Sequence, residues 1–433
     1  MKNLILIAGI STYLMLAFEF STQAQNSFIT TWQTNDTQIT IPTSGGGYNY
    51  DISWTNLSGS GIGDGLDNGI TGSYTISGLT TDTYQVQITG TFPRINFNNS
   101  GDKDKILTIA EWGTIQWSSM ETAFYGCTNL TVPATDAPDL SNVLSLNQMF
   151  RGATTFNESI EHWDVSNIVL FFGMFWDATS YNQPLNNWTL TNVKSISNMF
   201  HGASSFNQPL NNWVTTGLTD IKVMFKNAVS FNQSVNNFDV SLVQDFAGTF
   251  EGATSFDQPL NNWDMSSANT LALMFYQASS FNQDLSSWDV SKVSTMGFMF
   301  GFAGSFNQNL GNWDIGEVAS MTDMLFRSNL SVSNYDNTLI GWATISGSEI
   351  QIPTGITSFR AFDLSYCNAE IARQFLIDSQ GWEITLDSKA SICPPTITSF
   401  SPTSAAASAT VILTGTDFTG ATAVSFGGTP ASS

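Results

Sequence analysis

Basic residues are scarce in this sequence. The chain has 433 residues, with 13 Lys and Arg against 35 Asp and Glu, which gives a net charge of -22 at pH 7. A chain this acidic repels nucleic acid and anionic lipid headgroups, so we expect neither as a partner. Charged residues make up only 11% of the chain, so its surface must consist largely of Asn, Ser, Thr and Gly. That composition is typical of secreted proteins.

Cysteine and histidine are also rare, with three and two copies. No spacing of these residues matches a zinc site, and no nucleophile elbow accompanies a histidine, so the sequence predicts neither zinc nor a Ser-His-Asp enzyme. Cys367 and Cys393 are candidates for a disulfide in an oxidising compartment. We expect Cys127 to be a small buried residue rather than a reactive thiol.

Long hydrophobic runs are missing after the N-terminus. Residues 1–24 have one Lys, an apolar run that ends near Phe18, and small residues before Ala24, which predicts a signal peptide cleaved after Ala24. Glu19 and the shortness of the run argue against an uncleaved membrane anchor. We therefore expect a secreted or cell-surface protein with no membrane span after signal cleavage.

A 25-residue repeat dominates the middle of the chain. One column of the repeat is aromatic at Phe150, Phe175, Phe200, Phe225, Phe250, Phe275 and Phe300. Another is aromatic at Trp163, Trp188, Trp213, Trp263, Trp288 and Trp313. A single unit cannot bury these rings, whereas stacked copies form one continuous core. We therefore interpret both columns as structural core rather than as a ligand platform.

The two halves of each unit differ in apolar spacing. Val193, Ile196, Met199, Phe200 and Ala203 are spaced by 3, 3, 1 and 3, which is typical of one helix face. The other half, from Leu185 to Val193, has the L-x-x-L-x-L spacing of a leucine-rich repeat, in which the segment is a short strand. The sequence thus predicts an α/β fold, a right-handed leucine-rich-repeat-like solenoid of 25-residue strand-turn-helix coils.

An asparagine column accompanies the aromatic ones. It comprises Asn157, Asn182, Asn207, Asn232, Asn282 and Asn307, with Asp257 in the same register. An Asn at a corner of each coil can bond to backbone groups of its own coil and of the next. We interpret this column as structural.

The repeat is flanked by unlike segments. Residues 27–100 alternate polar residues with β-formers and predict a β-sandwich, and residues 101–330 form the solenoid. Residues 331–393 lose the register and are interpreted as a cap, because the last coil needs its apolar face covered. Residues 394–433 begin a further β domain.

The candidate binding surface lies beside the Trp column. Residues that flank a core residue on a strand point to the opposite face, which the leucine-rich-repeat analogy makes concave. The candidates are Asp164, Asn187, Asn237, Asp239, Asn262, Asp264, Asp289, Asn312 and Asp314. Carboxylates in such a file, about 5 Å apart, invite calcium or a basic patch on a partner. The simpler interpretation, which we favour, is that each Asp bonds to the turn that follows it.

The unit MF-x-x-A-x-x-FNQ-x-L-x-x-W-D-V-S-x-V resembles the repeat of BspA-like leucine-rich-repeat bacterial surface proteins over residues 120–330. The resemblance implies an exported protein, often of Bacteroidetes, that adheres to host or matrix proteins and has no catalytic motif. Departures at Phe238, Val214 and Thr249 indicate a weaker middle of the stack. The phrases SPTSAAASATVILTGTDF and AVSFGGTPAS resemble the opening strands of an IPT/TIG immunoglobulin-like domain.

Two function classes remain open from the sequence. The first is a non-enzymatic adhesion module that binds an extracellular protein or glycan through the candidate face. The second is a secreted polysaccharide-active enzyme that uses carboxylates on that face. Since an enzyme normally interrupts its repeat with unique residues, the repetitive Asp file favours binding.

Overall fold

The computed structural model describes residues 26–345, 351–393, 395–402, 410–416, 418, 425–426 and 429–430. The predicted signal peptide, residues 1–24, lies outside these residues, as does much of the predicted IPT/TIG segment. Within them, no helix is long and apolar enough to cross a membrane.

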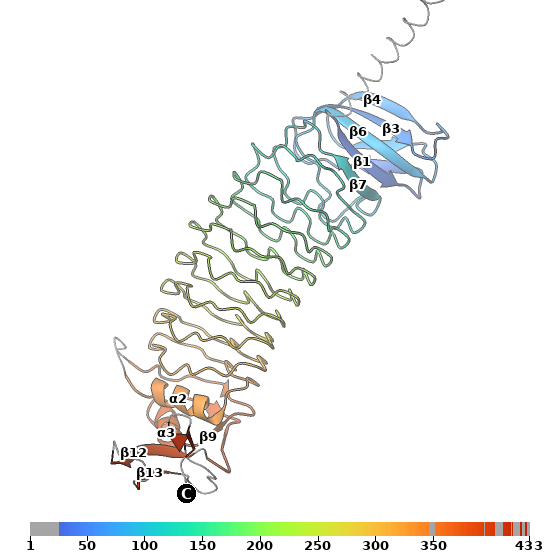
Figure 1. Cartoon of the computed structure of the whole chain (residues 1–433). Helices are drawn as coiled ribbons and strands as arrows, with labels where there is room; N and C mark the ends of the chain where they lie inside the picture. The colour runs from blue at the N-terminus through green and yellow to red at the C-terminus, as the bar shows by residue number, and fades with distance from the viewer. Residues whose placement is uncertain are drawn as a thin grey trace, which may run out of the picture.

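The chain begins with a sheet of five antiparallel strands in the order β4-β3-β6-β1-β7 (Figure 1). Their bounds are β1 Phe28–Gln33, β3 Asn49–Asn56, β4 Gly65–Ile70, β6 Thr83–Thr91 and β7 Ile106–Glu111. β2 (Gln38–Ile41) and β5 (Tyr74–Ser77) pair separately. β6 shows why these segments are strands, since Tyr84, Val86 and Ile88 alternate with more exposed residues and are buried. β7 follows residue 100, so the sheet extends past the predicted end of the N-terminal domain.

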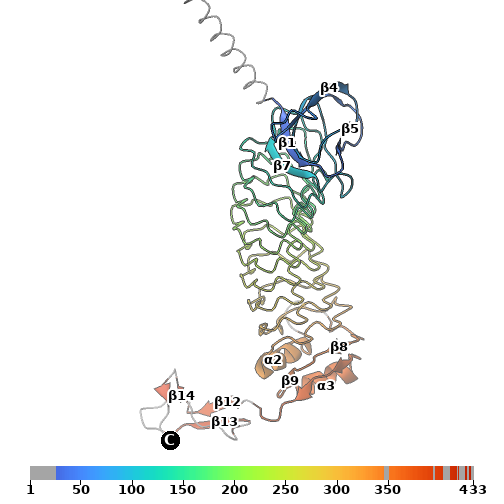
Figure 2. The same cartoon turned by 90° about the vertical axis from the view of Figure 1, so that its right-hand side faces the viewer.

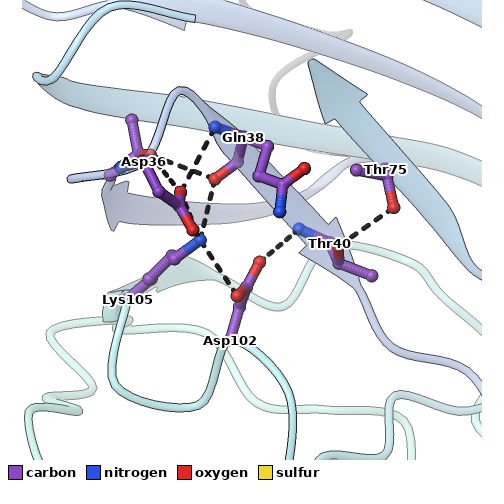
Figure 3. A network of polar contacts seen from close by, with 7 residues as sticks. Asp36, Gln38, Thr40, Thr75, Asp102 and Lys105 are labelled. Carbon is purple, nitrogen blue, oxygen red and sulfur yellow. Dashed lines mark hydrogen bonds and ion pairs between the residues drawn. The ribbon is translucent and has the colours of Figure 1, made fainter.

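A polar network fastens the start of β2 to the segment that leads into β7 (Figure 3). Lys105 Nζ lies 2.7 Å from Asp36 Oδ1 and 3.0 Å from Asp102 Oδ1. Asp102 Oδ2 also accepts the Thr40 N–H at 2.7 Å. Burial lowers the pKa of Lys105, but the hydrogen bonds to the two carboxylates outweigh burial and raise it. The lysine therefore stays charged and holds both acids.

β7 also connects the sheet to the repeat. β1 occupies one edge of β7, while on the other edge the Ile109 N–H bonds to the Thr131 carbonyl at 3.0 Å. Packing is continuous too, because Trp112 contacts Phe28 at 5.7 Å and Trp163 at 5.3 Å between ring centroids. The first coils therefore stack directly on the sheet.

The repeat forms coils that lie side by side from the sheet to α2, as both views show (Figures 1 and 2). Alternate N–H groups bond to carbonyls 24 residues ahead, on the next coil. Examples are Ile196 to Asp220 at 3.0 Å and Phe200 to Met224 at 2.9 Å. Single parallel bridges, such as Ser195 with Asp220, mark the same pairing. The coils are thus joined in parallel without forming regular strands.

The prediction of strand-turn-helix coils is wrong. In the described residues the α-helices are α2 and α3, of 11 and 9 residues, and neither lies in the repeat. Where a helix was expected, the N–H groups of Met199, His201 and Ala203 bond three residues back. Consecutive tight turns give the same spacing of three as a helix, and the N–H groups between them bond to the next coil instead of four residues back.

Two left-handed residues in each coil make this path. In one coil they are Asn198, with φ 55°, and Gly202, with φ 68°. The first position recurs at Gln148, Gly173, Val223, Gly248, Leu273, Phe298 and Asp323, and the second at Gly152, Asp177, Asn227, Gly252, Gln277, Phe302 and Arg327. Positive φ at non-glycine residues costs about 1–3 kcal/mol each. Stacking of the coils must therefore supply the free energy that holds these turns.

The predicted strand around each Trp is absent as well. The Trp188 N–H bonds to the Leu185 carbonyl at 3.1 Å, which closes a turn. The indole supplies the contact between coils, since Trp213 Nε1 donates to the Leu185 carbonyl, 28 residues back, at 2.8 Å. The same bond recurs at Trp188, Trp263, Trp288 and Trp313.

Aromatic rings fill the interior of the stack. Phe200 and Phe206 of one coil stack at 3.9 Å between ring centroids, and Phe200 and Phe225 of successive coils stack at 5.7 Å. The Phe and Trp residues of both predicted core columns are buried, with no more than 4% of their surface exposed. Burial of each such ring stabilises the fold by roughly 2–3 kcal/mol.

The asparagine column forms a ladder on one corner of the stack. Asn182 Oδ1 accepts the Asn207 N–H at 2.9 Å and the Gln208 side-chain amide at 3.0 Å. Asp257 fills the same role with a carboxylate, accepting from Asn282 N and Gln283 Nε2 at 2.9 and 2.8 Å. An acceptor at this position, charged or neutral, thus satisfies the backbone of the next coil.

α2 (Val332–Trp342) covers the last coil and takes over its contacts. Trp342 Nε1 bonds to the Leu310 carbonyl at 3.0 Å, as the Trp column does in the coils. The Asn334 side chain bonds to Asn307 Oδ1 at 2.9 Å, which extends the asparagine ladder. Ser331 caps the helix, since its side chain accepts the Asn334 N–H.

The segment after α2 packs on that helix. It contains β8 (Phe359–Arg360), β9 (Ser365–Tyr366), α3 (Glu370–Asp378), β10 (Ile384–Thr385) and β11 (Ser388–Lys389), with β8–β10 and β9–β11 as parallel pairs. The buried Asp336 carboxylate accepts the N–H groups of Cys367, Asn368 and Ala369 just before α3. A disulfide joins Cys367 to Cys393, and Cys127 is a buried free thiol.

Two further antiparallel pairs follow. They are β12 (Thr396–Ser401) with β13 (Ile412–Thr416), and β14 (Ser425–Phe426) with β15 (Thr429–Pro430). Figure 2 shows β12, β13 and β14 below α2 and to one side of it, away from the coils.

The ladder makes a testable prediction. Asn182→Ala removes the acceptor for two donors of the next coil, so we expect it to lower the free energy of unfolding by about 1–3 kcal/mol. Asn182→Asp keeps the acceptor, as Asp257 does naturally, and should cost much less. Urea unfolding followed by tryptophan fluorescence measures both variants. Equal losses from the two would show that the acceptor is not what the position supplies.

Candidate functional site

The nine candidate residues lie beside the buried Trp column, on a surface that we call the Asx face: Asp164, Asn187, Asn237, Asp239, Asn262, Asp264, Asp289, Asn312 and Asp314. Asp314 is half-buried and the other eight are exposed. They come from turns rather than strands, so their direction is fixed by the turn geometry and by the Trp side chains beneath.

Each aspartate of the face bonds to the turn that follows it. Asp264 Oδ1 accepts the Ser266 N–H at 3.0 Å, and Asp289 Oδ1 accepts both the N–H and the hydroxyl of Ser291, at 3.0 and 2.6 Å. Asp164, Asp239 and Asp314 make the same bond two residues ahead. These are Asx turns, as the simpler sequence interpretation had it. In each of these bonds the accepting atom is Oδ1.

The turn bonds also favour the ionised form of two of these carboxylates. Hydrogen bonds from the side chain and the N–H of Ser266 lower the pKa of Asp264, and Ser166 does the same for Asp164. A hydrogen bond to the charged form of an acid favours that form. Asp164 and Asp264 are therefore anionic at neutral pH and somewhat below it.

The side-chain amides of three asparagines on the Asx face are not used in hydrogen bonds within the described part of the chain. The side chains of Asn187, Asn262 and Asn312 make no hydrogen bond to any described residue. Asn237 differs, because its amide donates to the Trp213 carbonyl at 3.0 Å and so holds neighbouring coils together. An Asn side chain carries both donor and acceptor groups, so the three amides suit hydroxyls or peptide groups.

The face is hollowed where its aspartate file is interrupted. Thr189 and Val214 stand in the register of the aspartates, and there a surface depression of about 260 Å³ opens. Its lining is Asn186, Asn187, Trp188, Thr189, Leu190, Asn212 and Val214. Val214 is 48% exposed, so the depression combines an apolar patch with amide groups.

Several residues of the face escaped the sequence analysis. Asn186 Oδ1 accepts the Asn212 N–H and Asn236 Oδ1 accepts the Asn262 N–H, each at 2.9 Å, so a second asparagine ladder supports the face. The Thr215 hydroxyl supports the face as well, since it accepts the Asp239 N–H at 2.8 Å. The signal was present in the recurring Asn-Asn pairs, of which only second members such as Asn187 and Asn262 were predicted to belong to the face.

The aspartate file does not bring its carboxylates together as metal ligands. In the part of the chain that the structure describes, no group of three or more His, Cys, Asp or Glu side chains could hold a metal ion. Each carboxylate is bound to its own turn rather than turned toward its neighbour. The file therefore offers single carboxylates, one per coil.

The repeat of this chain matches the model of a known protein family. The family model described as "Mycoplasma protein of unknown function, DUF285" matches residues 118–238 and 219–338. Together these ranges cover just over half of the chain and nearly all of its repeat. No curated protein and no solved structure matches the chain.

The turn bonds predict a shift that can be measured. Ser266→Ala removes one donor to Asp264, so the pKa of Asp264 should rise toward the ordinary Asp value. The pKa of Asp164 should not change and serves as an internal control. Carboxyl carbon NMR during a pH titration measures both. Because the folded-state pKa of Asp264 is depressed, its turn bond stabilises the fold above the unfolded-state pKa, and that contribution is lost as the pH falls. An unchanged Asp264 pKa would contradict the assignment.

Proposed function

Given that this chain belongs to the family described as Mycoplasma protein of unknown function, DUF285, we propose that it is a non-enzymatic binding module of a secreted or bacterial cell-surface protein. It adheres through the Asx face to an extracellular protein or glycan. The resemblance of the repeat to that of BspA-like surface proteins supports an extracellular role.

The observation that carries the proposal is the repetition of exposed carboxylates on a fixed backbone. Asp239, Asp264 and Asp289 occupy one position in three successive coils, and each is bonded to its own turn. At about 5 Å per coil, they form a file that a row of basic groups on a partner can meet. Fixed side chains lose little conformational entropy on binding, which favours affinity.

The depression at Thr189 and Val214 adds a place without negative charge. The side-chain amides of Asn187 and Asn212, which make no hydrogen bond within the described part of the chain, border the exposed Val214 side chain there. A ligand with hydroxyls and an apolar face, such as a sugar ring, suits this lining.

The enzymatic alternative is supported less well. A glycosidase needs two carboxyl groups facing each other across a gap, commonly about 5–10 Å wide. The carboxylates of the Asx face instead stand in one file on the same surface, and each bonds to its own turn. That arrangement suits contact with a long partner better than acid and base acting on a single bond.

The test removes the negative charges of three aspartates on the Asx face. The triple variant Asp239→Asn, Asp264→Asn, Asp289→Asn keeps the turns, because an amide oxygen also accepts the N–H. We expect binding to a panel of immobilised extracellular proteins and to a glycan microarray to weaken by about tenfold or more. Thermal unfolding should change little.

A matched control removes the same charge elsewhere. Asp51, Asp363 and Asp378 are exposed and lie outside the coils, and their triple change to Asn should leave binding intact. Equal binding by wild type and face variant would overturn the role of the face. Reducing ends released from polysaccharide by the purified protein would favour the enzymatic alternative.

A further inference from the structure

A second surface runs along a different edge of the coils. In each coil one residue follows the recurring Phe of the core column and lies between the two left-handed residues of the tight turns. In the first five coils it is Tyr125, Arg151, Trp176, His201 or Lys226, all half-buried, and we call this row the edge strip. Its members come from consecutive coils, so they lie about 5 Å apart along the stack.

Arg151 is clamped between two rings. Its guanidinium carbon lies 3.6 Å from the ring centroid of Trp176 and 4.8 Å from that of Tyr125. His201 stacks on Trp176 at 4.7 Å with an angle of 15° between the planes. The ring of Trp176 is thus engaged on both sides by neighbours on the strip. The strip therefore presents ring edges, which carry the positive part of the aromatic quadrupole.

The guanidinium has no acidic partner. Among the described residues no carboxylate forms an ion pair with Arg151, although the chain has 35 acids and 13 bases. Lys226, three coils further, is paired with Glu251 at 2.9 Å. The Trp176 indole N–H makes no hydrogen bond to any described residue. Stacking leaves the in-plane N–H fork of an arginine available, and that fork matches a carboxylate or sulfate.

We infer that the edge strip binds a linear acidic polysaccharide, with a carboxylate of the polymer seated on the Arg151 fork and the neighbouring sugar over the Trp176 edge. A linear polymer can follow the strip along several coils while one of its carboxylates is seated on the Arg151 fork. Arg151 and His201 cover the two faces of the Trp176 ring, so an aromatic or aliphatic side chain of a protein partner cannot stack on it.

The overall charge of the protein does not forbid this site. Charges further away than about 8 Å are largely screened at physiological ionic strength. Asp177, exposed beside His201, and Glu251, which is paired with Lys226 of the neighbouring coil, are acids that lie next to the strip. Arg151 therefore carries the binding, and the far end of the strip adds little.

The test uses polygalacturonate, its fully methyl-esterified form and polyglutamate as probes, with the full chain and isothermal titration calorimetry. We expect polygalacturonate to bind, the ester to bind at least about tenfold more weakly, and polyglutamate to bind less well than polygalacturonate. Equal binding of the ester would overturn the anionic site. Equal or tighter binding of polyglutamate would assign the strip to an acidic protein segment instead, and no binding of any probe would reject the proposal.

Substitutions of Arg151 distinguish the effect of the planar guanidinium fork from that of positive charge alone. Arg151→Gln should weaken polygalacturonate binding about tenfold or more, and Arg151→Lys should restore little of it, because an ammonium lacks the planar fork. Lys194→Gln and Lys292→Gln remove exposed bases off the strip and should leave binding unchanged. Full binding by Arg151→Lys, or an equal loss in the controls, would contradict the clamp. Thermal unfolding of each variant identifies any loss that comes from misfolding.

Discussion

The structure depends on hydrogen bonds between coils rather than within them. Every second N–H of the double turn reaches a carbonyl of the next coil, while the N–H groups between them close tight turns three residues back. Neither set satisfies the backbone alone, and the left-handed residues that the path requires are unfavourable by themselves. A coil therefore holds its shape because its neighbours are in register with it. The buried rings, repeated at the same positions, set that register.

The sequence predicted the period and the contents of the core, because identical residues must fill identical places in a stack. It did not predict the path of the backbone. Ile196, Met199 and Ala203 are spaced as on a helix, yet the same spacing arises when turns close every three residues. Left-handed positions occupied by Val223, Leu273 or Phe298 carry no local signal, since such residues are rarely found there. Tertiary stacking decides their conformation, and one sequence without its neighbours in space cannot show that.

The candidate face was predictable where its chemistry is local. An Asp two residues before a Ser or Gly can bond to that residue's N–H in an isolated turn, and the structure has this bond at each aspartate of the face. The supports of the face were not predictable, because they join residues 26 or 28 positions apart through a side chain and a backbone group. The edge strip was invisible for a similar reason. Its residues differ from coil to coil, so the repeat pattern hides what their adjacency creates.

The way α2 closes the stack has a consequence for how such proteins change size. The helix offers Trp342 and Asn334 to the same groups that another coil would contact, and β7 joins the first coil through ordinary backbone pairing. The contacts at the two ends of the stack do not depend on the number of coils between them. A gene that gains or loses 75 nucleotides, three for each residue of the 25-residue period, can therefore lengthen or shorten the molecule in whole steps while both termini still fit. Recombination can thus change the length of the stack without requiring a new fold.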